Sequence, residues 1–208
     1  MLLDFLIKTY GQGEPIFLAD VSYKDMKPAM LRQTMSKLVE KGQLRRFDKG
    51  IYYIPDTSIF PSGAFLSNDK VIERRYLSDK DQRCGYISGQ NFANQFGLTT
   101  QVPMSCTVVS NKATTKERRI RLGKQEIILR QPRCTITKQN FLVLQILDLL
   151  ADVDRYSEIG QAEARQKFKD YFGRTAMGFS SLEQYLSYYP IKIFKNMYEM
   201  GLLYGVPA

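Results

Sequence analysis

The chain has 208 residues, of which 44% are hydrophobic and 25% are charged, a composition typical of folded protein and not of a disordered segment. Its 30 Lys and Arg residues against 21 Asp and Glu residues give a formal net charge of +9, which favours a polyanionic partner, nucleic acid before an acidic membrane surface. Histidine is absent, which excludes Ser-His-Asp and Cys-His catalytic sites and His-ligated zinc.

The sequence carries no signal for export or membrane insertion. Its N-terminus includes an acid at Asp4 and no apolar run of signal-peptide length. The most apolar stretch, residues 141–151, is interrupted by Gln145 and Asp148 and is too short to span a bilayer. The three cysteines lie far apart with no Cys-x-x-Cys pair, as expected of reduced thiols in the cytosol. We therefore expect a cytoplasmic protein with no membrane partner, no metal site and no cofactor.

The beginning of the chain predicts three helices. Apolar residues at helical spacing form the first helix, which ends at Gly11. Pro15 opens a short second helix. Pro28 lies in the first turn of the third helix, which runs to Lys41 and has Gly42 as its stop.

A two-stranded hairpin follows these helices. Residues 44–47 and 51–54 favour strands, and Gly50 between them can take the positive φ that a tight turn needs. Three helices and a two-stranded ribbon are the order of a winged helix-turn-helix. The pattern therefore predicts such a domain at residues 1–55 and a linker at residues 56–64.

Residues 65–208 predict a separate α/β domain with a small, mainly antiparallel sheet packed by helices, so the fold class of the chain is α+β. The helix over residues 138–150 is apolar nearly all round, which places it at the centre of the second core. The expected strands cover residues 106–110, 119–122 and 126–130. The expected helices cover residues 88–96, ended by Gly97; 138–150, capped by Thr137; 161–172, with Gly173 beyond its end; 181–186; and 190–203.

Basic residues gather first on the predicted third helix and hairpin, where residues 24–49 hold eight basic and three acidic side chains. The polar face of the helix would lie in the major groove, where Arg and Gln read guanine and adenine by paired hydrogen bonds. Basic side chains of the hairpin would hold the DNA backbone. The predicted DNA-binding residues are Lys27, Arg32, Gln33, Ser36 and Lys37 on the helix and Arg45, Arg46 and Lys49 on the hairpin.

A second basic region, residues 112–138, holds nine basic and two acidic side chains. Two interpretations are equally open: a second contact with nucleic acid, or a solvated loop and hairpin surface. Alternation along the strand turns Ile120 and Leu122 inward and its arginines outward under both. The residues concerned are Lys112, Lys116, Arg118, Arg119 and Arg121.

No catalytic residue is predicted. A helix, three strands and a helix invite comparison with metal-dependent nucleases that place an Asp and a Glu-x-Lys on adjacent strands. Here Glu126 is followed by two isoleucines, and no acid lies at residues 106–110. The glycine-rich phosphate-binding motifs are absent. Tyr86 and Ser88 are of types more often found in a core or on a surface than in catalysis.

Two segments resemble the AbiE-type antitoxins of type IV toxin–antitoxin systems. In LVEKGQLRRFDKGIYYIP, residues 38–55, a Leu-x-x-x-Gly helix stop, a basic strand and Gly-x-Tyr-Tyr-x-Pro are typical of that family's winged-helix domain. GYISGQNFANQFGLTTQVP, residues 85–103, is similar to the segment that opens the antitoxin C-terminal domain, and the helix containing Gln145 and Asp148 is similar as well. The matching residues of the first segment are Leu38, Gly42, Arg45, Arg46, Gly50, Tyr52, Tyr53 and Pro55.

The resemblance implies a bacterial transcriptional repressor that binds inverted repeats of double-stranded DNA upstream of its own operon and counteracts a partner toxin of nucleotidyltransferase type. One winged domain covers one half-site, so an inverted repeat would hold two copies, as a dimer on DNA. The expected function is therefore sequence-specific DNA binding and not catalysis. The alternative is a non-enzymatic interaction module that binds protein or RNA through its C-terminal domain and uses the winged helix for docking.

Overall fold

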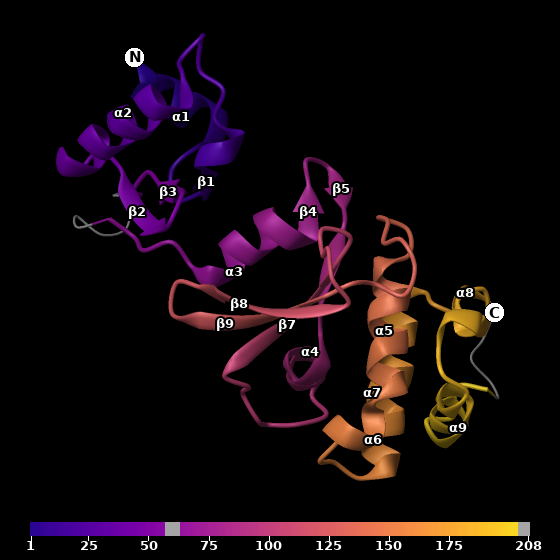
Figure 1. Ribbon diagram of the computed structural model, residues 1–208. Coiled ribbons are helices and arrows are strands. Elements are labelled where there is room, and N and C mark those ends of the chain that lie inside the picture. Colours follow the sequence, from indigo (N-terminus) through magenta and orange to yellow (C-terminus); the bar gives the residue numbers. More distant parts are fainter. Residues whose placement is uncertain (57–62, 204–208) are drawn as a thin grey trace. The chain divides into compact units, whose positions relative to one another are not determined.

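The computed structural model of the protein describes residues 1–56 and 63–203 and belongs to the mixed α+β class (Figure 1). The chain divides into two compact units. The N-terminal unit contains Met1–Arg74 and Leu122–Lys124, and the C-terminal unit contains Arg75–Arg121 and Gln125–Ala208. Most of the predicted linker at residues 56–64 lies outside the described residues, so the domain boundaries given above stay predictions.

The N-terminal unit begins with a helix, a short strand, a 3-10 turn, a second helix and a hairpin. Its sheet has the order β1-β3-β2, and both pairs are antiparallel. Buried side chains of both helices, the short strand and the second strand of the hairpin share one small core, which includes Leu6, Ile16, Met35 and Tyr52. The elements are α1 (Leu2–Tyr10), β1 (Ile16–Phe17), η1 (Leu18–Asp20), α2 (Pro28–Glu40), β2 (Arg45–Asp48) and β3 (Ile51–Tyr53).

The prediction of a second helix after Pro15 is wrong. Ile16 and Phe17 form strand β1, which pairs with Tyr52 and Ile51 of β3, and only the three residues of η1 are helical. Pro15 has no backbone N–H, and β-branched Ile16 favours extended backbone. Ile16 is fully buried, so pairing with β3 both satisfies its backbone and fills the core.

The predicted third helix and the hairpin are found within one residue of their expected ends. Helix α2 ends at Glu40, and Gly42 beyond it has φ 70°. In the hairpin Gly50 has φ 74°, a conformation that residues with a Cβ rarely adopt. A bulge between Arg46 and Asp48 shifts the strand register by one residue.

The helix, helical turn and hairpin between residues 68 and 83 were not predicted from the sequence. Helix α3 (Asn68–Ile72) is capped by Ser67, whose hydroxyl accepts a hydrogen bond from the Lys70 amide at 3.3 Å. A π-helical turn, η2 (Glu73–Leu77), and a small hairpin of β4 (Ser78–Asp79) and β5 (Gln82–Arg83) come next.

The main sheet of the C-terminal unit has the order β6-β7-β9-β8. Its strands are β6 (Gly85–Ser88), β7 (Ser105–Ser110), β8 (Glu117–Leu122) and β9 (Gln125–Arg130). Strand β6 is antiparallel to β7, but β7 and β9 are parallel, so the sheet is mixed. A two-residue turn joins β8 to β9, which makes that pair antiparallel. Strand β6 was not predicted, whereas the other three strands lie close to their predicted positions.

Helix α4 (Gly89–Phe96) follows β6 directly and ends at Gly97 as expected. Two other predicted helix ends are wrong. Thr137 does not cap α5 (Phe141–Ala151), because Asn140 holds the N-cap position and its side-chain oxygen accepts from the Thr137 amide at 2.7 Å. Gly173 lies inside α7 (Gln161–Thr175), which ends at Ala176 with φ 50°. The remaining elements are α6 (Val153–Tyr156), α8 (Phe179–Glu183), η3 (Leu186–Tyr188) and α9 (Lys192–Glu199), where residues 181–186 and 190–203 had been predicted helical.

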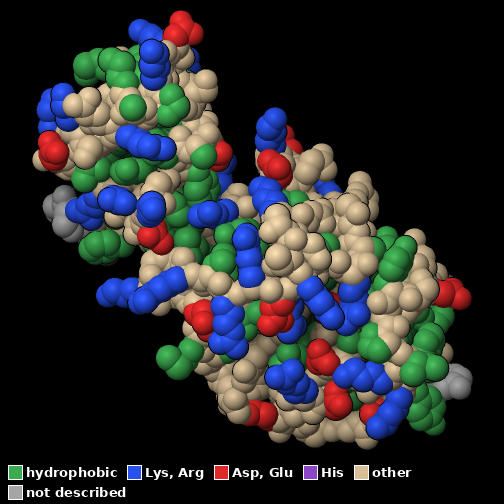
Figure 2. Space-filling model, in the orientation of Figure 1, with side chains coloured by type: hydrophobic (Ala, Val, Ile, Leu, Met, Phe, Trp, Pro, Cys, Tyr) green, Lys and Arg blue, Asp and Glu red, His purple; other side chains and the backbone are tan. Residues whose placement is uncertain are grey.

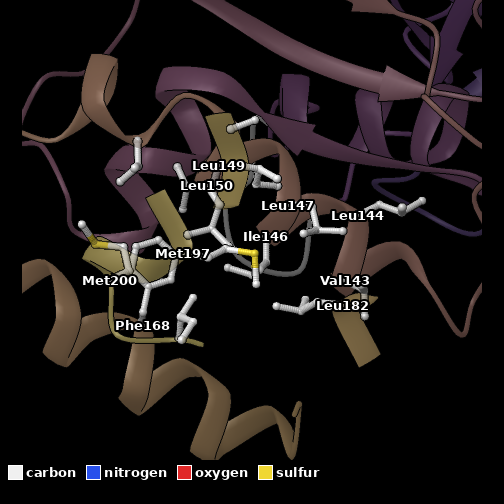
Figure 3. Packing of buried hydrophobic residues seen from close by; sticks show 14 of the residues in the cluster. Val143, Leu144, Ile146, Leu147, Leu149, Leu150, Phe168, Leu182, Met197 and Met200 are labelled. Carbon is white, nitrogen blue, oxygen red and sulfur yellow. The ribbon is translucent and has the colours of Figure 1, made fainter. Parts of the chain in front are cut away.

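Helix α5 lies at the centre of the core of the C-terminal unit, as its all-round apolar sequence predicted (Figure 3). Leu144, Ile146 and Leu147 are fully buried, and Phe168 of α7 and Met197 of α9 belong to the same cluster. Close packing of this kind fixes α5 in position and with it every side chain that α5 carries. Within residues 1–56 and 63–203, no helix has the length and apolar character needed to cross a membrane.

Candidate functional site

Helix α2 carries most of the side chains predicted to read DNA. Leu31 and Met35 are buried on one face of the helix, whereas the polar residues on the opposite face are exposed. The 3.6-residue period of the helix causes this separation. Arg32, Gln33, Ser36 and Lys37 therefore share one exposed face, and Lys27 is exposed at the N-cap of the same helix.

The hairpin places its three predicted cations in different surroundings. Arg46 and Lys49 are exposed. Arg45 is half-buried, because its guanidinium donates to the Gly63 carbonyl at 3.5 Å and lies 5.4 Å from the centroid of the Phe65 ring. The Asp48 carboxylate accepts from the Lys49 amide at 2.7 Å, which stabilises the turn. On the face shown in Figure 2, basic side chains predominate over acidic ones on the N-terminal unit, whereas the two kinds are mixed on the C-terminal unit.

The second basic region does not form one continuous group. The Lys112 ammonium donates to the Ser78 carbonyl at 3.3 Å and lies 3.7 Å from the Asp79 carboxylate, so it connects the turn after β7 to the β4–β5 hairpin. Arg119 lies 3.3 Å from Glu126 on the neighbouring strand. Lys116, Arg118 and Arg121 are exposed, and Ile120 and Leu122 are more buried than the arginines, as the alternation predicted.

A polar cavity of about 720 Å³ in the C-terminal unit escaped the sequence analysis. One wall is formed by Asp148 of α5, Asp152 between α5 and α6, and Tyr156 of α6, which are spaced four residues apart. Basic side chains on the other wall come from the residue before β8, from the end of β9 and from the loop after β9. Residues at the junction of β6 and α4 complete the lining. These remaining residues include Lys116, Arg130, Arg133, Ser88 and Gly89.

Asp148 is a largely buried carboxylate of this cavity, with 17% of its side chain exposed. Its Oδ2 accepts from the Tyr86 hydroxyl at 2.9 Å and from the Ser88 hydroxyl at 3.4 Å, and its Oδ1 lies 3.6 Å from Nε of Arg133. Burial raises the pKa of Asp148 above its ordinary value, and the hydrogen bond from Tyr86 and the charge of Arg133 oppose that rise. A carboxylate in such surroundings accepts hydrogen bonds strongly.

Two aromatic rings support this arrangement from the core side. The Arg133 guanidinium lies 4.8 Å from the centroid of the Tyr189 ring. The Tyr189 hydroxyl donates to the Leu144 carbonyl at 3.1 Å, which fixes the ring. Burial, followed by the negative charge of Asp148, raises the pKa of both Tyr86 and Tyr189, so both phenols stay protonated and act as donors.

Two further carboxylates of the cavity lining, Glu117 and Asp152, are held in ion pairs. Nε of Arg130 donates to Glu117 at 2.6 Å, and the Lys192 ammonium donates to Asp152 at 2.9 Å. Burial and then the charge of Asp152 raise the pKa of Tyr156, while the charges of Arg155 and Arg130 lower it. No three Asp, Glu or Cys side chains of the described ranges gather into a group that could hold a metal ion.

The sequence contained one signal of this site. Gln145 and Asp148 interrupt an otherwise apolar helix, and both bind β6: the Gln145 amide donates to the Ile87 carbonyl at 2.8 Å, and Asp148 accepts from Tyr86 and Ser88. Residues 85–103 and the helix that contains Gln145 and Asp148 both resemble the antitoxin family, and these polar contacts join them in space.

The chain matches the model of a family described as a family of unknown function (DUF6088). The match covers residues 3–172, which is most of the chain and includes helix α2, the β2–β3 hairpin and every residue named above on the cavity wall. None of the curated proteins matches the chain. The chain belongs to the DUF6088 family.

Proposed function

We propose that the protein is a sequence-specific DNA-binding repressor whose N-terminal unit contacts the operator. The observation that carries this proposal is the exposed face of α2, where Arg32, Gln33 and Lys37 lie together beside Ser36. Arg and Gln discriminate base pairs in the major groove by paired hydrogen bonds, each worth about 1–3 kcal/mol. The exposed cations of the hairpin, Arg46 and Lys49, are suited to phosphate contacts.

The order of elements supports the same proposal. Helix, strand, short helical turn, helix and two strands would form a winged helix-turn-helix in which one 3-10 turn, η1, replaces the middle helix. Strand β1 then closes a three-stranded sheet with the hairpin. In this arrangement α2 is the recognition helix and the turn at Lys49 and Gly50 is the tip of the wing.

The mechanism is passive. Helix α2 docks in the major groove, the hairpin contacts the backbone, and occupancy of the promoter blocks transcription. The resemblance to AbiE-type antitoxins extends the proposal to an autoregulatory cytoplasmic antitoxin that opposes a nucleotidyltransferase toxin, with two copies on an inverted repeat. The protein acts in this proposal by binding and not by catalysis.

The first test is fluorescence-anisotropy binding of the full chain to the DNA directly upstream of its own gene, with scrambled DNA as competitor and at two salt concentrations. Tight binding that resists the competitor supports the proposal. Weak binding that competitor removes and salt abolishes means that only non-specific attraction is present, and it favours the interaction-module alternative.

Substitutions on α2 and on the hairpin should have different effects. Arg32→Ala and Gln33→Ala should reduce the preference for operator over scrambled DNA by about 1–3 kcal/mol each, because they remove base contacts. Lys49→Ala should weaken binding to all sequences and lower the salt slope by about one unit, because it removes one phosphate contact. The same anisotropy titrations measure both quantities.

Lys8→Ala is the matched control, because Lys8 is an exposed cation on α1. It should change neither the preference nor the slope by a comparable amount. Wild-type binding by the α2 and hairpin variants alike would contradict this placement of the interface.

A further inference from the structure

We propose that the cavity beside Asp148 binds a nucleoside monophosphate, with the phosphate at the basic wall and the nucleoside at the acidic wall. This site is separate in the sequence from the DNA interface proposed above and does not depend on it. Every lining residue used in the argument belongs to the C-terminal unit.

The basic wall has the properties of an oxyanion site. Arg130 is held in place by Glu117 at 2.6 Å through Nε, which leaves its terminal N–H groups available to a ligand. Arg133 is held by Asp148 and by the Tyr189 ring. A guanidinium that is already ordered by such contacts loses little further freedom when it binds a phosphate, and its fork of donors matches the phosphate oxygens.

Lys116 adds an available positive charge beside these two arginines. Its side chain is exposed and forms no ion pair with any residue of the described ranges. An ammonium is a compact phosphate partner, and its attraction costs no existing contact.

The acidic wall suits the hydroxyl and amino groups of a nucleoside. Each carboxylate offers about four acceptor positions. Lys192 binds one oxygen of Asp152, so the Asp152 carboxylate, which lines the cavity, has acceptor positions left over. The Tyr156 ring lies on the same wall and provides an apolar surface against which a planar base can pack.

Size and charge narrow the ligand further. A volume of about 720 Å³ falls within the roughly 300–1,000 Å³ usual for small-molecule sites and exceeds what inorganic phosphate needs. The lining contains three cations and three carboxylates, so its formal charges cancel. Because Lys192 forms an ion pair with Asp152, the lining together with Lys192 has an excess of one positive charge. An excess this small matches a single phosphate better than a triphosphate.

The test is isothermal titration calorimetry of the full chain with AMP, CMP, GMP and UMP, and with inorganic phosphate, adenosine and ATP as comparison ligands. We expect at least one monophosphate to bind more tightly than inorganic phosphate, adenosine and ATP. Lys116→Gln and Arg130→Gln should each weaken that binding roughly tenfold or more, because each removes a charged contact to phosphate. Asp152→Asn should weaken the monophosphate but not inorganic phosphate.

Lys138→Gln is the matched control, because Lys138 is exposed, carries the same charge and does not line the cavity. It should leave the affinity unchanged. Lys116→Gln removes an exposed side chain without an ion pair, so its folding is not at risk and its result stands even if Arg130→Gln is unstable. Inorganic phosphate or ATP binding as tightly as every monophosphate, or equal loss in the Lys138→Gln variant, would overturn the proposal. Operator binding measured on the same variants reports separately on the DNA interface.

Discussion

Asp148 differs from a surface carboxylate in its burial, because only 17% of its side chain is exposed. It is the one carboxylate on helix α5, whose other residues except Gln145 are apolar, and it is held by hydrogen bonds from Tyr86 and Ser88 and by the charge of Arg133. These partners lie on β6 and on the loop after β9, so one side chain connects three segments. Removing a partner of a buried charge is costly, because the charge is then left without compensation.

The raised pKa of Asp148 leads to a pH-dependent contribution to stability. The folded protein binds this proton more tightly than the unfolded chain does, so the contribution of Asp148 to the free energy of unfolding falls as pH rises from its ordinary pKa to its raised pKa. The wild type should therefore gain stability relative to Asp148→Asn as pH is lowered through that interval. Urea denaturation of both proteins over a series of pH values measures the difference, and a difference that is constant or of opposite sign would contradict the assignment.

At the scale of single elements, two glycines have opposite effects: Gly50 allows the turn of the β2–β3 hairpin, and Gly173 lies inside helix α7. Gly50 has φ 74° in the hairpin turn and open space around its Cβ position, so Gly50→Ala should destabilise the N-terminal unit by about 1–2 kcal/mol through backbone strain alone. Gly173 lies inside α7, also with open space around it, so Gly173→Ala should stabilise the C-terminal unit by about 0.5–1 kcal/mol. Denaturant unfolding of the two variants tests the opposite signs, and the same sign for both would count against this explanation.

Elements with a strong local signal could be predicted from the sequence. Helix α1 and helix α2 have clear apolar faces and glycine stops, and the hairpin has a glycine turn, so their positions were found. Gly173 carried the same stop signal, yet α7 continues past it, because the buried Phe172 and the contacts of its last turn hold the helix together. Pro15 indicated the beginning of a helix, but the residues after it form a strand because they pair with β3, which is more than 30 residues away in the sequence.

The cavity could not be predicted in the same way, because its residues come together only through tertiary contacts. Tyr86 and Asp148 are 62 residues apart and meet through the packing of α5 on β6. The sequence suggested a core or a surface position for Tyr86, and the structure buries it, but its hydroxyl also donates to the Asp148 carboxylate. The exposed face of α2, in contrast, follows from a helical period that the sequence displays directly.

At the scale of the whole molecule, each unit contains a hydrophobic cluster of its own among the described residues. The cluster around Met35 and Leu6 and the cluster around Leu144 and Phe168 share no residue. Met35 and Leu144 are both fully buried. Replacing either with Ala should cost about 2–5 kcal/mol in the core concerned.

We expect this cost to stay within one unit. In native-state hydrogen exchange, Met35→Ala should speed exchange of the amides of α1 and α2 and leave those of α5 unchanged, and Leu144→Ala should do the reverse. Each variant serves as the control for the other. Equal acceleration in both units by either variant would mean that the cores unfold as one cooperative system.

Strand β8 has a consequence for the molecule in a crowded solution. It is the last strand of its sheet, so one row of its backbone N–H and C=O groups has no neighbouring strand within that sheet. Such a border is a template on which other polypeptides can add and begin to aggregate. Arg118, Arg119 and Arg121 crowd this border with positive charge, so two copies of it repel each other. We expect these arginines to protect the border without any ligand, and we expect the net charge of +9 to oppose association between copies of the chain.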